Sequence, residues 1–132
     1  LKKKENYVPN IIVHLRPTYP IREKGLIDSC IKLLIKKKDF HSLRTICISD
    51  DPIEKMWFKN KDNSIFNPVT KNTQNHSIAD QSLPQSYHQN SCVDVLRVKQ
   101  TILKNRIAGH KILGYEMNHN YDIDTLKDFK KL

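Results

Sequence analysis

Glycine is scarce in this sequence, and its scarcity excludes the common phosphate-binding loops. The 132 residues contain three glycines, Gly25, Gly109 and Gly114, each of them isolated. Neither G-x-G-x-x-G nor G-x-x-x-x-G-K-[ST] occurs, so no glycine-rich loop can wrap backbone N–H groups around a phosphate. A nucleotide site in these residues must therefore be built differently, or lie partly outside them.

Cysteine and long apolar runs are also limited. Cys30, Cys47 and Cys92 are odd in number, far apart and set among aliphatic residues, which is typical of buried thiols in a reducing compartment rather than of disulfides. No window approaches the apolar length that crosses a bilayer, and the start of the chain lacks a signal-peptide core. We expect a soluble, cytoplasmic protein with no membrane among its partners.

Positive charge is plentiful, with 23 Lys and Arg against 14 Asp and Glu and a formal net charge of +9. A basic surface attracts nucleic acid, but the lysine clusters lie at the ends of segments, at Lys2 to Lys4, Lys36 to Lys38 and near the C-terminus. Aromatic residues are not interleaved with them, and no RNA-binding or zinc-finger pattern is present. We interpret most of these lysines as solvated, and nucleic acid as a disfavoured partner.

The first half of the chain has the pattern of a doubly wound α/β protein. Its length allows one domain with a modest core. The apolar run Asn10 to Leu15 predicts a strand buried on both faces of a parallel sheet. Arg22 to Lys38 has apolar residues at helical spacing, and Leu43 to Ser49 predicts a second strand, parallel to the first. Strand, helix and strand together predict a mostly parallel sheet.

The second half predicts an arm and further strands. Lys55 to Lys59 is expected to be extended and Lys61 to Asn63 to form a turn, as in a hairpin or arm. Asn67 to Ser82 is polar and predicts a long loop, and residues 59–82 together form the predicted polar loop or dimerisation arm. Later elements are expected as a strand at Ser91 to Val98, a short helix at Lys99 to Asn105, a strand at Lys111 to Met117, and a helix at Leu126 to Leu132 capped by Asp124 or Thr125.

The segment Leu15 to Arg22 is the first candidate site. It follows the first predicted strand, where a doubly wound sheet presents its ligand crevice. Pro17 and Pro20 restrict the loop, so Arg16, Thr18 and Arg22 can be held ready for an anionic or hydroxyl-rich ligand. The alternative is that both arginines bind neighbouring carbonyls or pair with nearby acidic residues. Spacing alone does not separate these two interpretations.

Two further stretches carry groups suited to a ligand. Asp122 and Asp124 lie on one side of an extended segment and suit a Mg²⁺ ion that bridges substrate phosphates. In such a pair, however, it is more common for one aspartate to be solvated and for the other to cap a helix. Tyr87, Gln89 and Asn90 offer phenol and amide groups for sugar hydroxyls or a base edge. The histidines show no i, i+4 pairing and no cysteine stands at zinc spacing, so we expect no zinc site.

Five colinear motifs resemble one enzyme family. They are L-R-P-T-x-P-x-R at Leu15 to Arg22, S-L-R-T at Ser42 to Thr45, P-x-x-K-M-W at Pro52 to Trp57, L-P-x-x-Y-x-Q-N followed by V-D-V at Leu83 to Val95, and D-I-D-T-x-x-D-F at Asp122 to Phe129. In this order and separation they resemble the C-terminal half or more of the acylneuraminate cytidylyltransferases, the CMP-sialic acid synthetase family.

The resemblance implies a Rossmann-like nucleotide-sugar transferase domain. Such an enzyme transfers CMP from CTP to the anomeric hydroxyl of a nine-carbon acidic sugar, releases pyrophosphate and uses Mg²⁺. The motif match implies that Asp122 and Asp124 hold the metal and that Arg16 and Lys55 are catalytic, with Lys55 reaching toward a partner's site in a homodimer. The implied substrate-binding residues are Arg16, Thr18, Arg22, Tyr87, Gln89 and Asn90.

The sequence also departs from the family pattern. Its members begin with a glycine- and lysine-bearing loop that grips the CTP phosphates, and none occurs here, so we expect that about the first third of such an enzyme is missing and that this chain alone has no turnover. Asp80 stands where many relatives have Arg, which would repel an anionic substrate, and Ser91 replaces a glycine, which predicts a strained turn. A fragment, a divergent enzyme, a decayed relative and a non-catalytic basic module for nucleic acid or acidic sugar all remain open.

Overall fold

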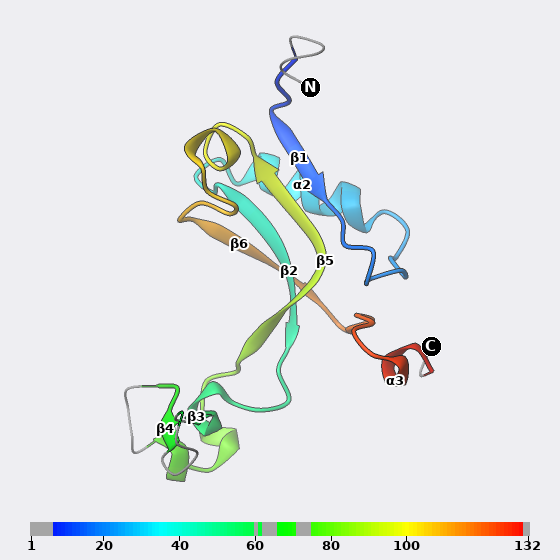
Figure 1. Ribbon diagram of the computed structural model, residues 1–132. Helices are drawn as coiled ribbons and strands as arrows, with labels where there is room; N and C mark the ends of the chain where they lie inside the picture. Colours follow the sequence, from blue (N-terminus) through cyan, green and yellow to red (C-terminus); the bar gives the residue numbers. More distant parts are fainter. Residues whose placement is uncertain (1–6, 60, 62–65, 71–74, 131–132) are drawn as a thin grey trace. The chain divides into compact units, whose positions relative to one another are not determined.

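A computed structural model of the chain describes residues 7–59, 61, 66–70 and 75–130. They form two compact units, one from residues 1–47 and 89–132, here called the sheet unit, and one from Ile48–His88, here called the arm unit. Helices and strands are labelled as in Figure 1. Within the described residues, no helix is both long and apolar enough to cross a membrane.

The sheet unit contains a four-stranded mixed sheet in the order β1-β5-β2-β6. The strands of the sheet are β1 (Ile11–His14), β2 (Ser42–Ile48), β5 (Tyr87–Arg97) and β6 (Ile112–Met117). The last residue of β2 and the first two of β5 are counted in the arm unit. β1 pairs antiparallel with β5, and β2 pairs parallel with β6. Figure 1 shows that β5 also runs opposite to β2. The prediction of an α/β protein with a mixed sheet is confirmed, but the sheet is not mostly parallel, because a central strand runs against its neighbours.

β1 differs most from its prediction. Its apolar run indicated a strand buried on both faces, but β1 is the edge strand of the sheet and its Ile11, Ile12 and Val13 are only half-buried. β1 and β2 run in the same direction, as the strand–helix–strand pattern predicted, yet β5 lies between them (Figure 1). A short run of apolar residues records hydrophobicity and not position in a sheet, so it could not separate an edge strand from a central one.

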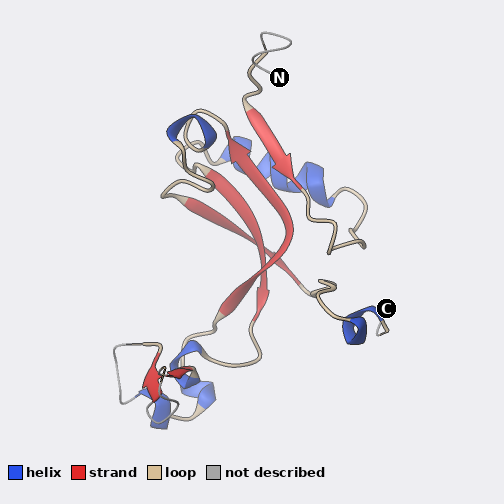
Figure 2. Cartoon of the chain, viewed as in Figure 1, coloured by secondary structure: helices blue, strands red, loops and turns tan. Residues whose placement is uncertain are grey.

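Helix α2 (Leu26–Lys36) packs on one face of the sheet through residues one turn apart, Leu26, Cys30 and Leu34. The helix begins later than the predicted Arg22 because Gly25 has φ 83°, a left-handed conformation that does not continue into a helix. Figure 2 shows α2 lying along the sheet. Among the described residues it is the only helix longer than one turn, so helices on both faces, as in a doubly wound protein, are not seen there.

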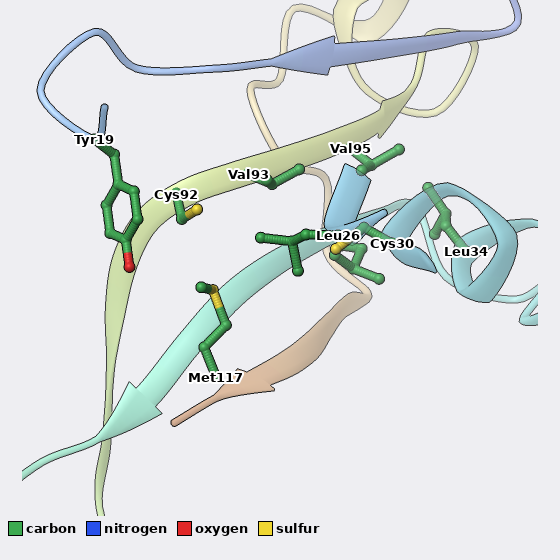
Figure 3. Packing of buried hydrophobic residues seen from close by; sticks show 9 residues of the cluster. Tyr19, Leu26, Cys30, Leu34, Cys92, Val93, Val95 and Met117 are labelled. Carbon is green, nitrogen blue, oxygen red and sulfur yellow. The ribbon is translucent and has the colours of Figure 1, made fainter. Parts of the chain in front are cut away.

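The core lies between α2 and the sheet. Figure 3 shows α2 side chains facing Val93 and Val95 of β5 and Met117 of β6. Each fully buried aliphatic side chain stabilises the fold by about 1.5–3 kcal/mol relative to its exposure. The buried Thr45 joins β2 to β5, because its Oγ1 accepts from Val93 N at 3.0 Å and donates to Val93 O at 3.3 Å.

The remaining elements of the sheet unit are short. A single 3₁₀ turn, η4 (Ile102–Lys104), stands where the sequence predicted a short helix. Helix α3 (Leu126–Phe129) is shorter than predicted, and the last residues of that prediction, 131–132, lie outside the described residues. Thr125 is its cap, and not Asp124.

The arm unit contains a hairpin and three 3₁₀ turns. β3 (Trp57–Lys59) pairs antiparallel with β4 (Phe66–Pro68), which confirms the predicted hairpin. The turns are η1 (Ile53–Lys55), η2 (Asn75–Ser77) and η3 (Asp80–Ser82), so the predicted loop from Asn67 to Ser82 contains the end of a strand and two turns. Of the predicted turn Lys61 to Asn63, residues 62 and 63 lie outside the described residues.

Candidate functional site

The loop that follows β1 and the segment that follows β6 are joined at one end of the sheet unit. Ile123 N donates to Thr18 O at 2.8 Å. Tyr19, which is fully buried, packs against Tyr121 with ring centroids 6.4 Å apart and donates its hydroxyl to His119 O at 3.3 Å. Burial raises the pKa of Tyr19, so the phenol keeps the proton that it donates. Two of the three predicted site segments are therefore neighbours.

Arg22 holds this loop against β5. Its Nε donates to Cys92 O at 3.2 Å, its Nη2 donates to Arg16 O at 2.7 Å, and its guanidinium lies 6.0 Å from the centre of the Tyr19 ring. Hydrogen bonds from a charged donor are each worth about 1.5–3 kcal/mol. The structure therefore shows Arg22 in the alternative role considered for it, as a side chain that binds neighbouring carbonyls.

Arg16 and Thr18 face the solvent. Both are exposed, and the Arg16 guanidinium makes no hydrogen bond or ion pair with any residue that the structure describes. Its backbone is held, because Arg16 O accepts from Tyr19 N at 3.3 Å as well as from Arg22. A fixed backbone with a free guanidinium is suited to binding an anionic ligand.

Asp122 has one carboxylate oxygen without a partner. Its Oδ1 is buried and accepts no hydrogen bond from the described residues, while its backbone N donates to Asn120 Oδ1 at 3.2 Å. Asp124 is exposed. The part of the chain that the structure describes contains no group of three or more His, Cys, Asp or Glu side chains that could hold a metal. Mg²⁺, however, is commonly held by one or two carboxylates together with substrate phosphates, and an orphaned buried carboxylate oxygen fits that donor set.

The thiol next to this site is protonated at neutral pH. Burial raises the pKa of Cys92; the Arg22 guanidinium opposes this rise, and the Asp122 carboxylate adds to it. Burial also raises the pKa of Cys30 on α2 to about 12. A thiol is nucleophilic as the thiolate, so neither cysteine is suited to nucleophilic catalysis. The predicted burial of the three cysteines is confirmed.

The predicted amide ligands have different surroundings. Asn90 is 1% exposed, its Nδ2 donates to the Met117 sulfur at 3.3 Å, and its Oδ1 accepts from Cys92 N at 3.3 Å. It therefore braces the backbone of β5 at Ser91, whose φ of 58° confirms the predicted strain, although the residue lies in a strand and not in a turn. Gln89 is exposed, and its Oε1 accepts from Arg44 Nη1 at 2.6 Å.

Lys55 and Tyr87 belong to the arm unit. The Lys55 ammonium donates to His76 O at 2.8 Å and to Ile78 O at 2.6 Å, and lies 3.4 Å from Asp80 Oδ1. Asp80, which the sequence predicted to repel an anionic substrate, is thus the ion-pair partner of Lys55. Tyr87 is exposed and lines a hollow of about 380 Å³ with Ile53 and Met56.

A row of ionisable side chains across three strands was not predicted. Asp94 of β5 is buried, with its Oδ1 3.6 Å from Arg44 Nε and its Oδ2 3.7 Å from His14 Nδ1. Through Arg44 the row reaches Gln89. A single acidic residue in the apolar run V-D-V was the available signal, because a buried carboxylate requires a partner.

No family model matches this chain, and no curated protein matches it. The family resemblance of its motifs therefore stays a prediction.

Proposed function

We propose that this chain forms the sugar- and metal-binding part of a cytidylyltransferase that transfers CMP from CTP to a nine-carbon acidic sugar and releases pyrophosphate. The observation that carries the proposal is the bond from Ile123 N to Thr18 O, with the Tyr19 contacts around it. Two motifs about 100 residues apart meet there, as a shared substrate site requires.

The chemistry of the described side chains agrees with this activity. The sugar hydroxyl attacks the α-phosphorus in line, so the protein mainly positions its substrates and neutralises charge. Arg16, whose backbone is held and whose guanidinium has no partner among the described residues, would bind the sugar carboxylate beside the Thr18 hydroxyl. Asp122 and Asp124 would hold Mg²⁺, which when bound supplies positive charge to the phosphates. Gln89, oriented by Arg44, would keep its Nε2 available to donate to the sugar.

Three predicted residues enter the proposal in changed roles. Arg22 and Asn90 use their polar atoms within the fold, so they act by positioning the loop after β1 and the left-handed backbone at Ser91 in β5. Lys55 would have to leave Asp80 and two backbone carbonyls before it could meet a substrate. The proposed catalytic role of Lys55 therefore requires a rearrangement of the arm unit, in the proposed homodimer or on substrate binding.

Ligand binding tests this proposal better than turnover, because the 132 residues contain no glycine-rich loop for the CTP phosphates. We expect calorimetry to detect Mg²⁺-dependent binding of CMP-N-acetylneuraminate, and Asp122→Asn and Arg16→Ala each to weaken it about ten-fold or more. Asp28→Asn, which alters an exposed acid on α2, is the matched control and should leave binding unchanged.

Two outcomes would contradict the proposal. Pyrophosphate release from CTP and sialic acid by this chain alone would show that a CTP site exists without the loop. Salt-sensitive binding of RNA together with no binding of the CMP-sugar would favour the alternative, a non-catalytic basic module.

A further inference from the structure

The fold gathers cations that are separated in the sequence into one end of the sheet unit. Two segments, residues 34–41 and 97–111, form this end, here called the basic pole. Their single acidic residue is Asp39. The cationic residues of the basic pole are Lys36, Lys37, Lys38, Arg97, Lys99, Lys104, Arg106 and Lys111.

Hydrogen bonds join the two segments directly. Arg97 Nη2 donates to Leu34 O at 2.6 Å, and its Nε donates to Phe40 O at 3.1 Å. His41 N donates to Lys111 O at 2.8 Å. Figure 1 shows the C-terminal end of α2 and the turn η4 at the same end of the sheet. Because these bonds fix the backbone, the surrounding lysines are held near one another even though their side chains are exposed.

Exposed aliphatic side chains lie among these cations. Ile107 is 76% exposed and Leu103 is 54% exposed, and Ile102 of η4 is also exposed. Lys104 and Arg106, both exposed, stand between them in the sequence. Asn105, with φ 54°, turns the backbone between the two cations. Large aliphatic side chains held this far into solvent within a basic surface are typical of sites that meet a partner.

The combination of charges and aliphatic side chains favours a lipid surface over nucleic acid. Residues 97–111 contain no Phe, Tyr or Trp, so bases have no stacking platform there. A nucleic-acid phosphate backbone would leave the exposed isoleucine and leucine side chains without an apolar partner. A membrane interface can bind both kinds of side chain, because cations contact the lipid headgroups and aliphatic side chains insert at the acyl boundary.

We propose that the basic pole docks on an anionic membrane surface, with Leu103 and Ile107 entering the interface and the surrounding lysines and Arg106 meeting the lipid headgroups. The expectation that no membrane is a partner was drawn from the lack of a spanning segment, which does not bear on binding to the surface. This inference does not depend on the proposed enzymatic function, since the groups that carry it lie outside the candidate site.

Vesicle flotation tests the proposal with the chain as it is. We expect binding to vesicles of phosphatidylserine and phosphatidylcholine, little binding to pure phosphatidylcholine, and weaker binding as salt is raised. Lys104→Glu removes one positive and adds one negative charge and should weaken binding about thirty-fold. Ile107→Ser should weaken it several-fold, because it removes the apolar contact. Circular dichroism of each variant verifies that the fold is kept.

Matched controls come from α3 in the same unit. Leu126 is 81% exposed, and Lys127 follows it in the sequence. The variants Leu126→Ser and Lys127→Glu should bind the anionic vesicles as well as the unaltered chain does. Equal binding to neutral and anionic vesicles, or an equal loss in the controls, would overturn the proposal. The proposal would also be overturned, in favour of nucleic acid, by two results together. These are duplex RNA binding as tight as binding to anionic vesicles, and an Ile107→Ser variant that binds both RNA and vesicles as the unaltered chain does.

Discussion

Ser91 has a strained backbone that the sequence predicts and a support that only the structure shows. The motif match placed it where members of the resembled family have glycine, and its φ of 58° lies in the left-handed region. Asn90 supports this backbone conformation through its buried amide. The sequence could predict the strain because a missing glycine is a local feature. It could not show that Asn90 supports the backbone at Ser91, because that depends on Met117 and Cys92 being its neighbours.

Replacing Ser91 with glycine should stabilise the protein. A non-glycine residue in the left-handed conformation destabilises the folded state by about 1–2 kcal/mol. Glycine avoids that strain, but its greater conformational freedom in the unfolded chain lowers the free energy of unfolding by about 0.5–1 kcal/mol. We therefore expect Ser91→Gly to raise the free energy of unfolding by about 0.5–1 kcal/mol in urea denaturation. Ser91→Ala, which keeps the Cβ, should give no gain. A glycine variant less stable than the unaltered chain would show that the serine hydroxyl outweighs the strain.

Arg22 and Arg16 illustrate how one motif can contain two roles. Both are arginines in the same short loop, and spacing gave them equal prospects as ligand-binding groups. The structure separates them, because Arg22 donates to two carbonyls within the fold while the guanidinium of Arg16 is exposed. A guanidinium that already donates to structural carbonyls has fewer donors left for a ligand.

Among the elements, α3 is the one whose boundary depends most on local chemistry. Thr125 accepts from Asp128 N at 3.2 Å, and Asp128 Oδ2 accepts from Thr125 N at 3.0 Å, which completes a capping box. The helix has four residues, and Leu126 and Phe129 on it are both exposed. Packing therefore contributes little to α3, and the cap is its main support.

Removing that cap should loosen α3 without unfolding the protein. Thr125→Ala is expected to cost about 1 kcal/mol locally, so amide hydrogen exchange at residues 126–130 should become about five-fold faster. Thermal unfolding of the whole chain should be unchanged, as it should be in the control Lys127→Ala. A lower melting temperature in the threonine variant alone would show that α3 belongs to the cooperative core.

At the scale of the whole molecule, the arm unit exposes apolar side chains that the rest of its residues do not cover. Trp57 and Phe58 of β3 are exposed, with Phe58 at 63%, and Ile53 and Met56 line the hollow of about 380 Å³. Large apolar side chains exposed in this number are typical of an interface. They lie just before residues 59–82, the predicted dimerisation arm, and extend the proposed interface toward Ile53.

The proposed homodimer can be followed through Trp57, the only tryptophan of the chain. Its fluorescence should shift to longer wavelength on dilution as the dimer dissociates and water reaches the indole. Phe58→Ser should weaken dimerisation about ten-fold or more, as loss of an aromatic anchor does, in sedimentation velocity. Leu126→Ser, on the sheet unit, should have no effect. Sedimentation as a monomer at every concentration would contradict the prediction.

The sequence by itself determined the properties that are local or periodic. Alternation and helical spacing predicted most strands, the helix α2 and the cap of α3, because hydrophobic periodicity and hydrogen bonding act over a few residues. The absence of glycine loops excluded the common phosphate sites for the same reason. Only the tertiary structure decided that β5 lies between β1 and β2, that Asp94 reaches Arg44, and that the loop after β1 meets the segment after β6. Those contacts join residues far apart in the chain, and which of them form depends on how the whole sheet packs rather than on any short pattern.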